Sequence, residues 1–71
     1  MEITYDKDAD AIYIEFSNAE FARNKKIDSE TIIDIDDKGQ IIGIELLRVS
    51  KRIPKDFLRS VRVKNIGLEM D

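Results

Sequence analysis

The strongest constraint on the fold of this chain is a β-hairpin pattern near its middle. Apolar runs at residues 31–35 and 41–47 flank a polar stretch that contains Gly39. Glycine can adopt the left-handed backbone conformation of a tight turn, because it has no Cβ to clash. Asp36 or Asp37 can accept hydrogen bonds from the amides of its own turn. The pattern therefore predicts two antiparallel strands joined by a short loop.

The alternation of side chains predicts how these two strands pair. A loop over residues 36–39 places Ile35 opposite Gln40 and Ile33 opposite Ile42. A loop one residue shorter would mix apolar and acidic side chains on both faces of the sheet. The predicted apolar face comprises Ile33, Ile35, Ile42, Ile44 and Leu46, and the opposite face carries Asp34 and Glu45.

Three further segments show the two-residue period of β-strands. Ile3 and Tyr5 share one face of a short first strand, and residues 12–16 alternate in a second. Residues 20–27 follow a turn-forming pair at residues 17–18 and are predicted as a third strand. With the hairpin, the chain has four or five strands.

The segment after the hairpin changes character. Residues 48–53 carry too many charges for a central strand. Pro54 suits the first turn of a helix, where its missing amide costs nothing, and apolar residues from Phe57 onward recur at helical spacing. We predict a short helix over residues 54–60. Two alternatives, strand or coil, stay open for residues 61–68.

The predicted fold class is α+β: a small antiparallel β-meander of four or five strands with one short C-terminal helix. We expect a single domain over residues 1–71. A chain of 71 residues buries only about 60% of its unfolded surface, so its core is marginal. The sequence has no cysteine and no histidine, which excludes disulfides and the commonest zinc ligands. Oligomerisation is the remaining stabiliser, because open sheet edges pair readily, and we expect a homodimer.

The missing histidine and cysteine also limit catalysis. A Ser-His-Asp triad, a Cys-His pair and an imidazole base are all excluded, so the composition argues against an enzyme, and we assign no catalytic residue and no cofactor. The N-terminal residues show no signal peptide, and no apolar run is long enough to cross a bilayer. We expect a cytoplasmic protein that has no membrane partner.

The first hairpin contains a row of aspartates that resembles part of a calcium-binding loop. Asp6, Asp8 and Asp10 fit the first three ligand positions of an EF-hand loop. Ala11 stands where that loop needs glycine, and Ser17 stands where it needs a bidentate glutamate. We interpret the aspartates as turn formers that bind backbone amides. No metal ligand is assigned.

A second acidic group offers another reading as a metal or acid–base site. Asp34 and Glu45 could share the outer face of the sheet, and paired carboxylates can hold magnesium or transfer protons. We favour a solvated face that keeps the protein soluble, with a carboxylate metal site as the second alternative function. Tyr13 is interpreted as a cross-strand packing residue whose hydroxyl points to water. Along the sequence, this second acidic group comprises Asp28, Glu30, Asp34, Asp36 and Asp37, and Glu45 belongs to the following strand.

The charge is unevenly distributed along the chain. Residues 1–47 carry 5 Lys/Arg and 12 Asp/Glu, whereas residues 48–64 carry 7 Lys/Arg and 1 Asp/Glu. Clustered cations can bind the phosphates of nucleic acid or an acidic partner. We favour packing of the basic segment near the acidic sheet, because the acidic remainder would repel a polyanion. The candidate contact residues are Arg48, Lys51, Arg52, Lys55, Arg59, Arg62 and Lys64.

The motifs of the two hairpins together resemble a known family. They are Tyr5-Asp6, Ala9-Asp10-Ala11-Ile12-Tyr13-Ile14, Ile33-Asp34-Ile35-Asp36-Asp37-Lys38-Gly39, Ile42-Gly43-Ile44-Glu45-Leu46-Leu47 and Ser50-Lys51. This combination, over residues 3–52, resembles the DUF2283 family, small prokaryotic proteins of uncharacterised function. The resemblance implies no catalytic residues. Some such proteins look like neighbours of toxin-like proteins, which implies an antitoxin-like or partner role.

Three functions of different classes follow from these observations. The leading prediction is a non-catalytic protein-interaction module that is homodimeric and of the antitoxin-like type that the resemblance implies. The first alternative is nucleic-acid binding through the basic segment, residues 48–64. The second alternative is a carboxylate metal-binding protein.

Overall fold

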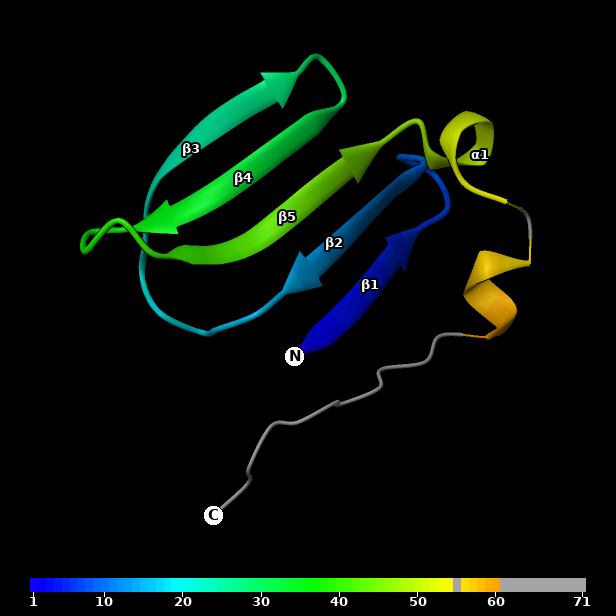
Figure 1. The fold of residues 1–71 in the computed structure, drawn as a ribbon. Helices are drawn as coiled ribbons and strands as arrows, with labels where there is room; N and C mark the ends of the chain where they lie inside the picture. Colours follow the sequence, from blue (N-terminus) through cyan, green and yellow to red (C-terminus); the bar gives the residue numbers. More distant parts are fainter. Residues whose placement is uncertain (55, 61–71) are drawn as a thin grey trace, which may run out of the picture.

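The computed structural model describes residues 1–54 and 56–60 and shows one antiparallel sheet with two short helical segments (Figure 1). This arrangement confirms the predicted α+β fold class. The strand predicted over residues 20–27 is also confirmed. The elements are β1 (Glu2–Asp6), β2 (Ala11–Glu15), β3 (Phe21–Asp28), β4 (Thr31–Asp36), β5 (Ile41–Leu47), the α-helix α1 (Val49–Arg52) and the 3-10 helix η1 (Phe57–Arg59).

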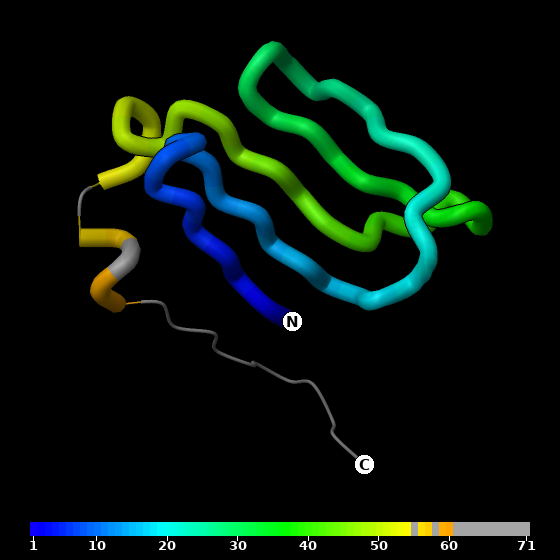
Figure 2. Tube along the Cα trace, turned by 180° about the vertical axis from the view of Figure 1, so that it is seen from behind, coloured from blue at the N-terminus to red at the C-terminus, as the bar shows by residue number. Residues whose placement is uncertain are grey.

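The strands lie in the order β1-β2-β5-β4-β3. Residues 16–20 carry the chain from β2 past the ends of β5 and β4 to β3 (Figures 1 and 2). The amides of Phe16 and Ser17 donate to the carbonyl oxygen of Ile42 at 2.8 and 3.3 Å, which ties the start of this connection to β5. Within the described residues, β1 and β3 are the two edges of the sheet.

The turn between β4 and β5 has the predicted chemistry. Gly39 has a φ of 81°, the left-handed conformation that favours glycine. Its amide donates to the carbonyl oxygen of Asp36 at 3.1 Å. A carboxylate oxygen of Asp36 accepts the amides of Lys38 and Gln40 at 2.9 and 2.8 Å. Of the two predicted aspartates, Asp36 is the one that holds the turn.

The register of this hairpin differs from the predicted one. The predicted pairing of Ile33 with Ile42 is wrong, because Ile33 lies opposite Ile44. A register shift near the turn then places Ile35 opposite Ile41, one residue beyond its predicted partner. Such a bulge adds a residue to one strand without leaving a mark in the alternation of the sequence. The shift along the rest of the hairpin is two residues, which preserves the faces.

The two faces of the sheet therefore differ as expected. The apolar face carries Ile3, Tyr5, Ile12, Ile14, Ile33, Ile44 and Leu46, which lie opposite one another across β1, β2, β5 and β4. The polar face carries Tyr13, Asp34 and Glu45. The buried hydrophobic residues of the described chain are Ile12, Ile35, Ile42 and Val49. The core of this part of the chain is correspondingly small.

The helical segments lie at one end of the sheet (Figure 1). The helix predicted over residues 54–60 is corrected: η1 is a short 3-10 turn, and the α-helix α1 comes earlier. Arg48, with a φ of 54°, turns the chain directly after β5, so α1 forms in the charged segment. Residue 55 of the predicted helix lies outside the described residues. Residues 61–68, for which strand and coil were the two alternatives, also lie outside them. No helix in the described part is long and apolar enough to cross a membrane.

Candidate functional site

Asp6 is the turn former of the β1–β2 turn, as predicted for the aspartates of this hairpin. A carboxylate oxygen of Asp6 accepts the amides of Asp8 and Ala9, both at 3.0 Å. This geometry satisfies backbone donors with a local side chain. Among residues 1–54 and 56–60, no group of three or more carboxylates is arranged to hold a metal ion.

Asp10 has a separate role, which the sequence did not reveal. It has a φ of 53° at the end of the turn, and its carbonyl oxygen accepts the amide of Val49 at 3.1 Å. Its carboxylate accepts the amide of Ser50 at 3.0 Å and the hydroxyl of Ser50 at 2.6 Å. The flanking residue Arg48 makes no side-chain capping bond to α1. Asp10 therefore caps the helix from a distant turn, as a local aspartate would.

A polar cluster lies on the other face of the sheet, as the sequence predicted for Asp34 and Glu45. Tyr13 extends across Gly43, where an added Cβ would lie 2.1 Å from the tyrosine hydroxyl. Gly43 lies opposite Asp34, so the hydroxyl lies over the sheet beside Asp34, which corrects the expectation that it points to water. Partial burial, followed by a hydrogen bond to Asp34 and the Asp34 charge, raises the pKa of Tyr13.

The carboxyl group of Glu45 belongs to the same cluster. Partial burial, followed by the charge of Asp34 and a hydrogen bond to it, raises the pKa of Glu45. A carboxyl group with a raised pKa can share a proton with its neighbour. However, Tyr13, Asp34 and Glu45 lie on neighbouring strands of the same face and interact with one another. We interpret the cluster as a hydrogen-bonded patch that organises β2, β5 and β4.

The structure describes four of the seven candidate contact residues, Arg48, Lys51, Arg52 and Arg59. Arg48 pairs with Glu30 at 3.1 Å. Lys51 and Arg59 are exposed. Lys55, Arg62 and Lys64 lie outside the described residues. The prediction that the seven residues bind nucleic acid or an acidic partner stays a prediction.

Arg52 joins the basic segment to the β3–β4 turn. Its guanidinium donates to the carbonyl oxygens of Glu30 and Leu47 and, at 2.7 Å, to the hydroxyl of Thr31. In the same turn, a hydrogen bond from the Glu30 amide lowers the pKa of Asp28, and the charge of Arg52 acts in the same direction. Arg52 is thus bound to two carbonyl groups and a hydroxyl of its own chain.

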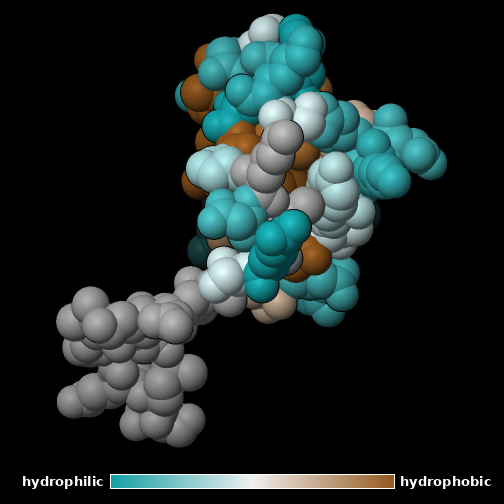
Figure 3. Space-filling model, turned by 90° about the vertical axis from the view of Figure 1, so that its right-hand side faces the viewer, coloured by the Kyte–Doolittle hydropathy of each residue, from teal (hydrophilic) through white to brown (hydrophobic). Residues whose placement is uncertain are grey.

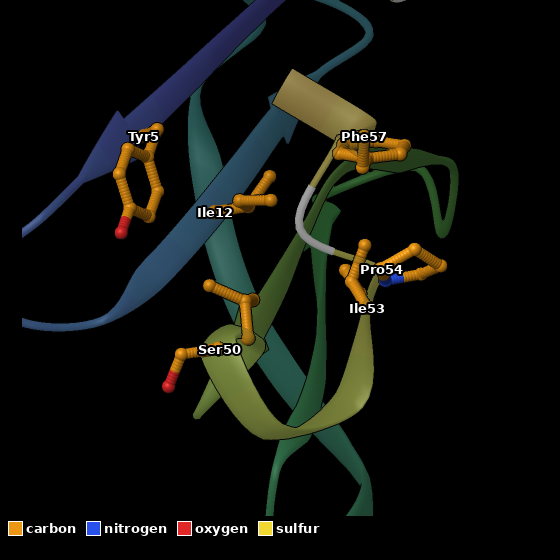
Figure 4. A pocket seen from close by; sticks show the side chains of 7 residues that line it. Tyr5, Ile12, Ser50, Ile53, Pro54 and Phe57 are labelled. Carbon is orange, nitrogen blue, oxygen red and sulfur yellow. The ribbon is translucent and has the colours of Figure 1, made fainter. Parts of the chain in front are cut away.

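An apolar pocket of about 170 Å³ lies between the sheet and the helical segments. In Figure 4, Tyr5 lies on one side of the pocket, Ile12 lies between, and Ile53, Pro54 and Phe57 lie on the other. Phe57 is only half-buried where it lines this pocket. Sequence reasoning gave Tyr5 no role. The signal available for it was its alternation with Ile3, which places it on the apolar face.

The family comparison gives one match. The model of DUF2283, described as a protein of unknown function, matches residues 2–50. No curated protein and no solved structure matches the chain. The matched range contains the five strands of the described residues and both partners of the Asp10–Ser50 contact.

Proposed function

The chain belongs to the DUF2283 family, proteins of unknown function, and from this premise we propose that it is a non-catalytic protein-interaction module that acts as a homodimer. The observation that supports the proposal is the apolar face of the sheet. The described elements that lie on it, α1 and η1, gather at the end formed by Tyr5 and Ile12. A second copy would cover the rest.

The centre of this face suits a contact between two copies. Ile14 of β2 lies opposite Ile44 of β5, which lies opposite Ile33 of β4, and all three are only half-buried. Phe16, the next residue in the alternation of β2, is 46% exposed. Two such faces stacked on each other would interdigitate as in a β-sandwich. Covering them would add the apolar burial that a short chain needs.

The edges of the sheet suit a symmetric dimer less well. An antiparallel β1–β1 pair centred on Thr4 would place Glu2 opposite the partner's Asp6. A β3–β3 pair centred on Asn24 would place Arg23 opposite the partner's Lys25. Like charges directly opposite each other destabilise a pair of strands. Face-to-face association is therefore the favoured arrangement.

The chemistry of the side chains supports a role without catalysis. The chain has no histidine and no cysteine, and the carboxylates of Asp34 and Glu45 are engaged with each other and with Tyr13. We extend the proposal to a cytoplasmic protein that binds a further protein partner in the manner of an antitoxin. A net charge of −3 favours a basic partner.

Sedimentation equilibrium of the full chain tests the homodimer. We expect a mass of twice 8.2 kDa that falls towards the monomer mass on dilution. Ile14→Thr should weaken the dimer about thirtyfold, because about 1 kcal/mol of apolar burial is lost in each copy. Ile32→Thr makes the same change at a half-buried side chain on the opposite, polar face of the sheet, where Ile32 lies opposite Glu45, and should leave the dimer intact. A monomer at all concentrations, or equal effects of the two variants, would refute the dimer.

A further inference from the structure

The outer edge of β1 adjoins the apolar pocket. β1 pairs with β2 on one side, and none of the other described strands pairs with its second side. Tyr5 belongs to β1, lines the pocket and is 40% exposed. Figure 3 views the molecule from the side of α1 and η1 and shows hydrophobic residues exposed among hydrophilic ones. Among the described residues, an unpaired strand edge therefore lies next to a hydrophobic recess.

The size of the recess limits what can enter it. Its volume is about 170 Å³, close to the roughly 150 Å³ of an apolar cavity that holds benzene. Sites for whole small molecules are larger, about 300–1,000 Å³. The recess therefore fits one apolar side chain. Its walls, including Ile12, Ile53 and Phe57, offer such a side chain van der Waals contact.

The two faces of β1 call for different side chains on an added strand. Ile3 and Tyr5 lie on the apolar face, whereas Glu2, Thr4 and Asp6 lie on the other and are exposed. An extended segment paired with β1 would place successive side chains on alternate faces. Every second residue would lie beside Ile3, Tyr5 and the recess. The intervening residues would lie beside the carboxylates.

We propose that the outer edge of β1 and the adjoining recess bind an extended segment of a partner protein in which apolar residues alternate with lysine or arginine. Backbone hydrogen bonds along the edge would supply affinity, and the recess and the carboxylates would supply specificity. The inference rests on the proposed role in protein interaction and names the chemistry of a partner beyond the second copy.

Strands of a second copy fit this site poorly. A second β1 would bring Glu2 and Asp6 against like charges. β3 carries cations at the adjacent positions Lys25 and Lys26, so its positive charges fall on both faces. Joining β3 of one copy to β1 of the next would also repeat without closing, which produces filaments.

A fluorescently labelled peptide of alternating valine and arginine tests the proposal. Titration with the full chain should raise its fluorescence anisotropy, and the affinity should fall as salt is added. A peptide of alternating valine and glutamate is the matched control and should not bind. Residues 61–64 of the chain itself alternate apolar and basic residues, so they have the pattern of the peptide and could compete with it. The R62E/K64E variant, which loses this pattern of charge, is therefore titrated as well. Binding to either protein supports the proposal.

Two substitutions locate the peptide on β1. Glu2→Lys should weaken binding about fivefold, because one attractive surface pair becomes repulsive. Glu20→Lys makes the same charge change in the β2–β3 connection and should have no effect. Tyr5→Thr should also weaken binding, because it removes one wall of the recess. All three sites are exposed, and circular dichroism checks that each variant folds.

The outcomes separate this inference from the proposed function. If Glu2→Lys and Glu20→Lys weaken binding equally, the peptide responds to overall charge and the β1 site is refuted. If neither the wild type nor R62E/K64E binds the peptide while sedimentation gives a dimer, the site fails and the proposed function stands. If the protein is a monomer that binds no peptide, both fail.

Discussion

Asp10 joins two parts of the chain that lie 40 residues apart. Its carboxylate accepts the amide and the hydroxyl of Ser50, and its carbonyl oxygen accepts the amide of Val49. At the scale of single residues, this contact explains why so short a helix forms at all. A helix of 4 residues is too short to be stable alone. The capping bonds and the burial of Val49 hold it in place.

Asp10→Gly removes the carboxylate but tolerates the positive φ of this position. We expect the free energy of unfolding to fall by about 1–2 kcal/mol, the usual cost of losing a helix cap. Urea unfolding at a fixed protein concentration measures it. Ser50→Ala should cost less in the Asp10→Gly background than in the wild type, because its hydroxyl bonds to that carboxylate. Additive costs would show that the two residues do not interact.

Gly43 provides the space that Tyr13 occupies. Gly43→Ala should destabilise the fold by about 1–3 kcal/mol, since the new methyl group would displace the tyrosine ring. In a Tyr13→Ala background the same change should cost much less, because the ring is gone. Thermal unfolding of the four proteins completes the double-mutant cycle. An equal cost in both backgrounds would contradict the placement of the ring.

The raised pKa of Glu45 predicts how the stability of the fold depends on pH. Its pKa is raised from the ordinary value of 4.5 in the folded state, so the contribution of Glu45 to stability is present below that value and is lost as pH rises through the folded pKa. Glu45→Gln removes this loss. We expect the variant to be more stable than the wild type at neutral pH and equally stable near pH 3–4. A difference that does not change with pH would refute the raised pKa.

At the scale of elements, the β3–β4 turn is fastened to the end of β5 by Arg52. Its guanidinium reaches two carbonyl oxygens and the hydroxyl of Thr31. Arg48 adds a pair with Glu30, but pairs this exposed contribute only about 0–1 kcal/mol. The first turn of the basic segment therefore bridges β5 and β4, in line with the predicted packing against the acidic sheet.

Arg52→Ala should lower the free energy of unfolding by about 1–3 kcal/mol, because it removes charge-assisted hydrogen bonds to the β3–β4 turn. Lys51→Ala removes the same charge from an exposed neighbour and should change stability by less than about 0.5 kcal/mol. Chemical denaturation of both variants measures the difference. Similar small effects would mean that Arg52 does not fasten the turn.

The elements differ in how well their sequences predict them. β4 and β5 carry apolar residues at alternate positions, and Gly39 marks the turn between them, so the hairpin and its two faces followed from the pattern. The bulge near Ile35 did not, because a change of register leaves composition and alternation untouched. The helix was misplaced because its cap comes from Asp10, and no local pattern around Val49 records so distant a partner. The recess beside Tyr5 was missed because its walls come from segments that are distant in the sequence, so no local pattern records it.

At the scale of the whole molecule, the described residues bury four hydrophobic side chains, three in the sheet and Val49 in α1. The sheet therefore has more apolar surface than its helical segments cover. The polar face carries the interacting side chains of Tyr13, Asp34 and Glu45. In our proposal, the centre of the apolar face contacts another copy, and the edge of β1 pairs with a strand of a different partner.

The most direct test of this account is isotope-filtered NMR on an equimolar mixture of labelled and unlabelled full-length protein. Nuclear Overhauser effects between copies should connect the methyl groups of Ile14, Ile33 and Ile44, because face-to-face stacking brings these side chains together. The absence of any contact between copies, or contacts confined to the edge strands β1 and β3, would contradict it.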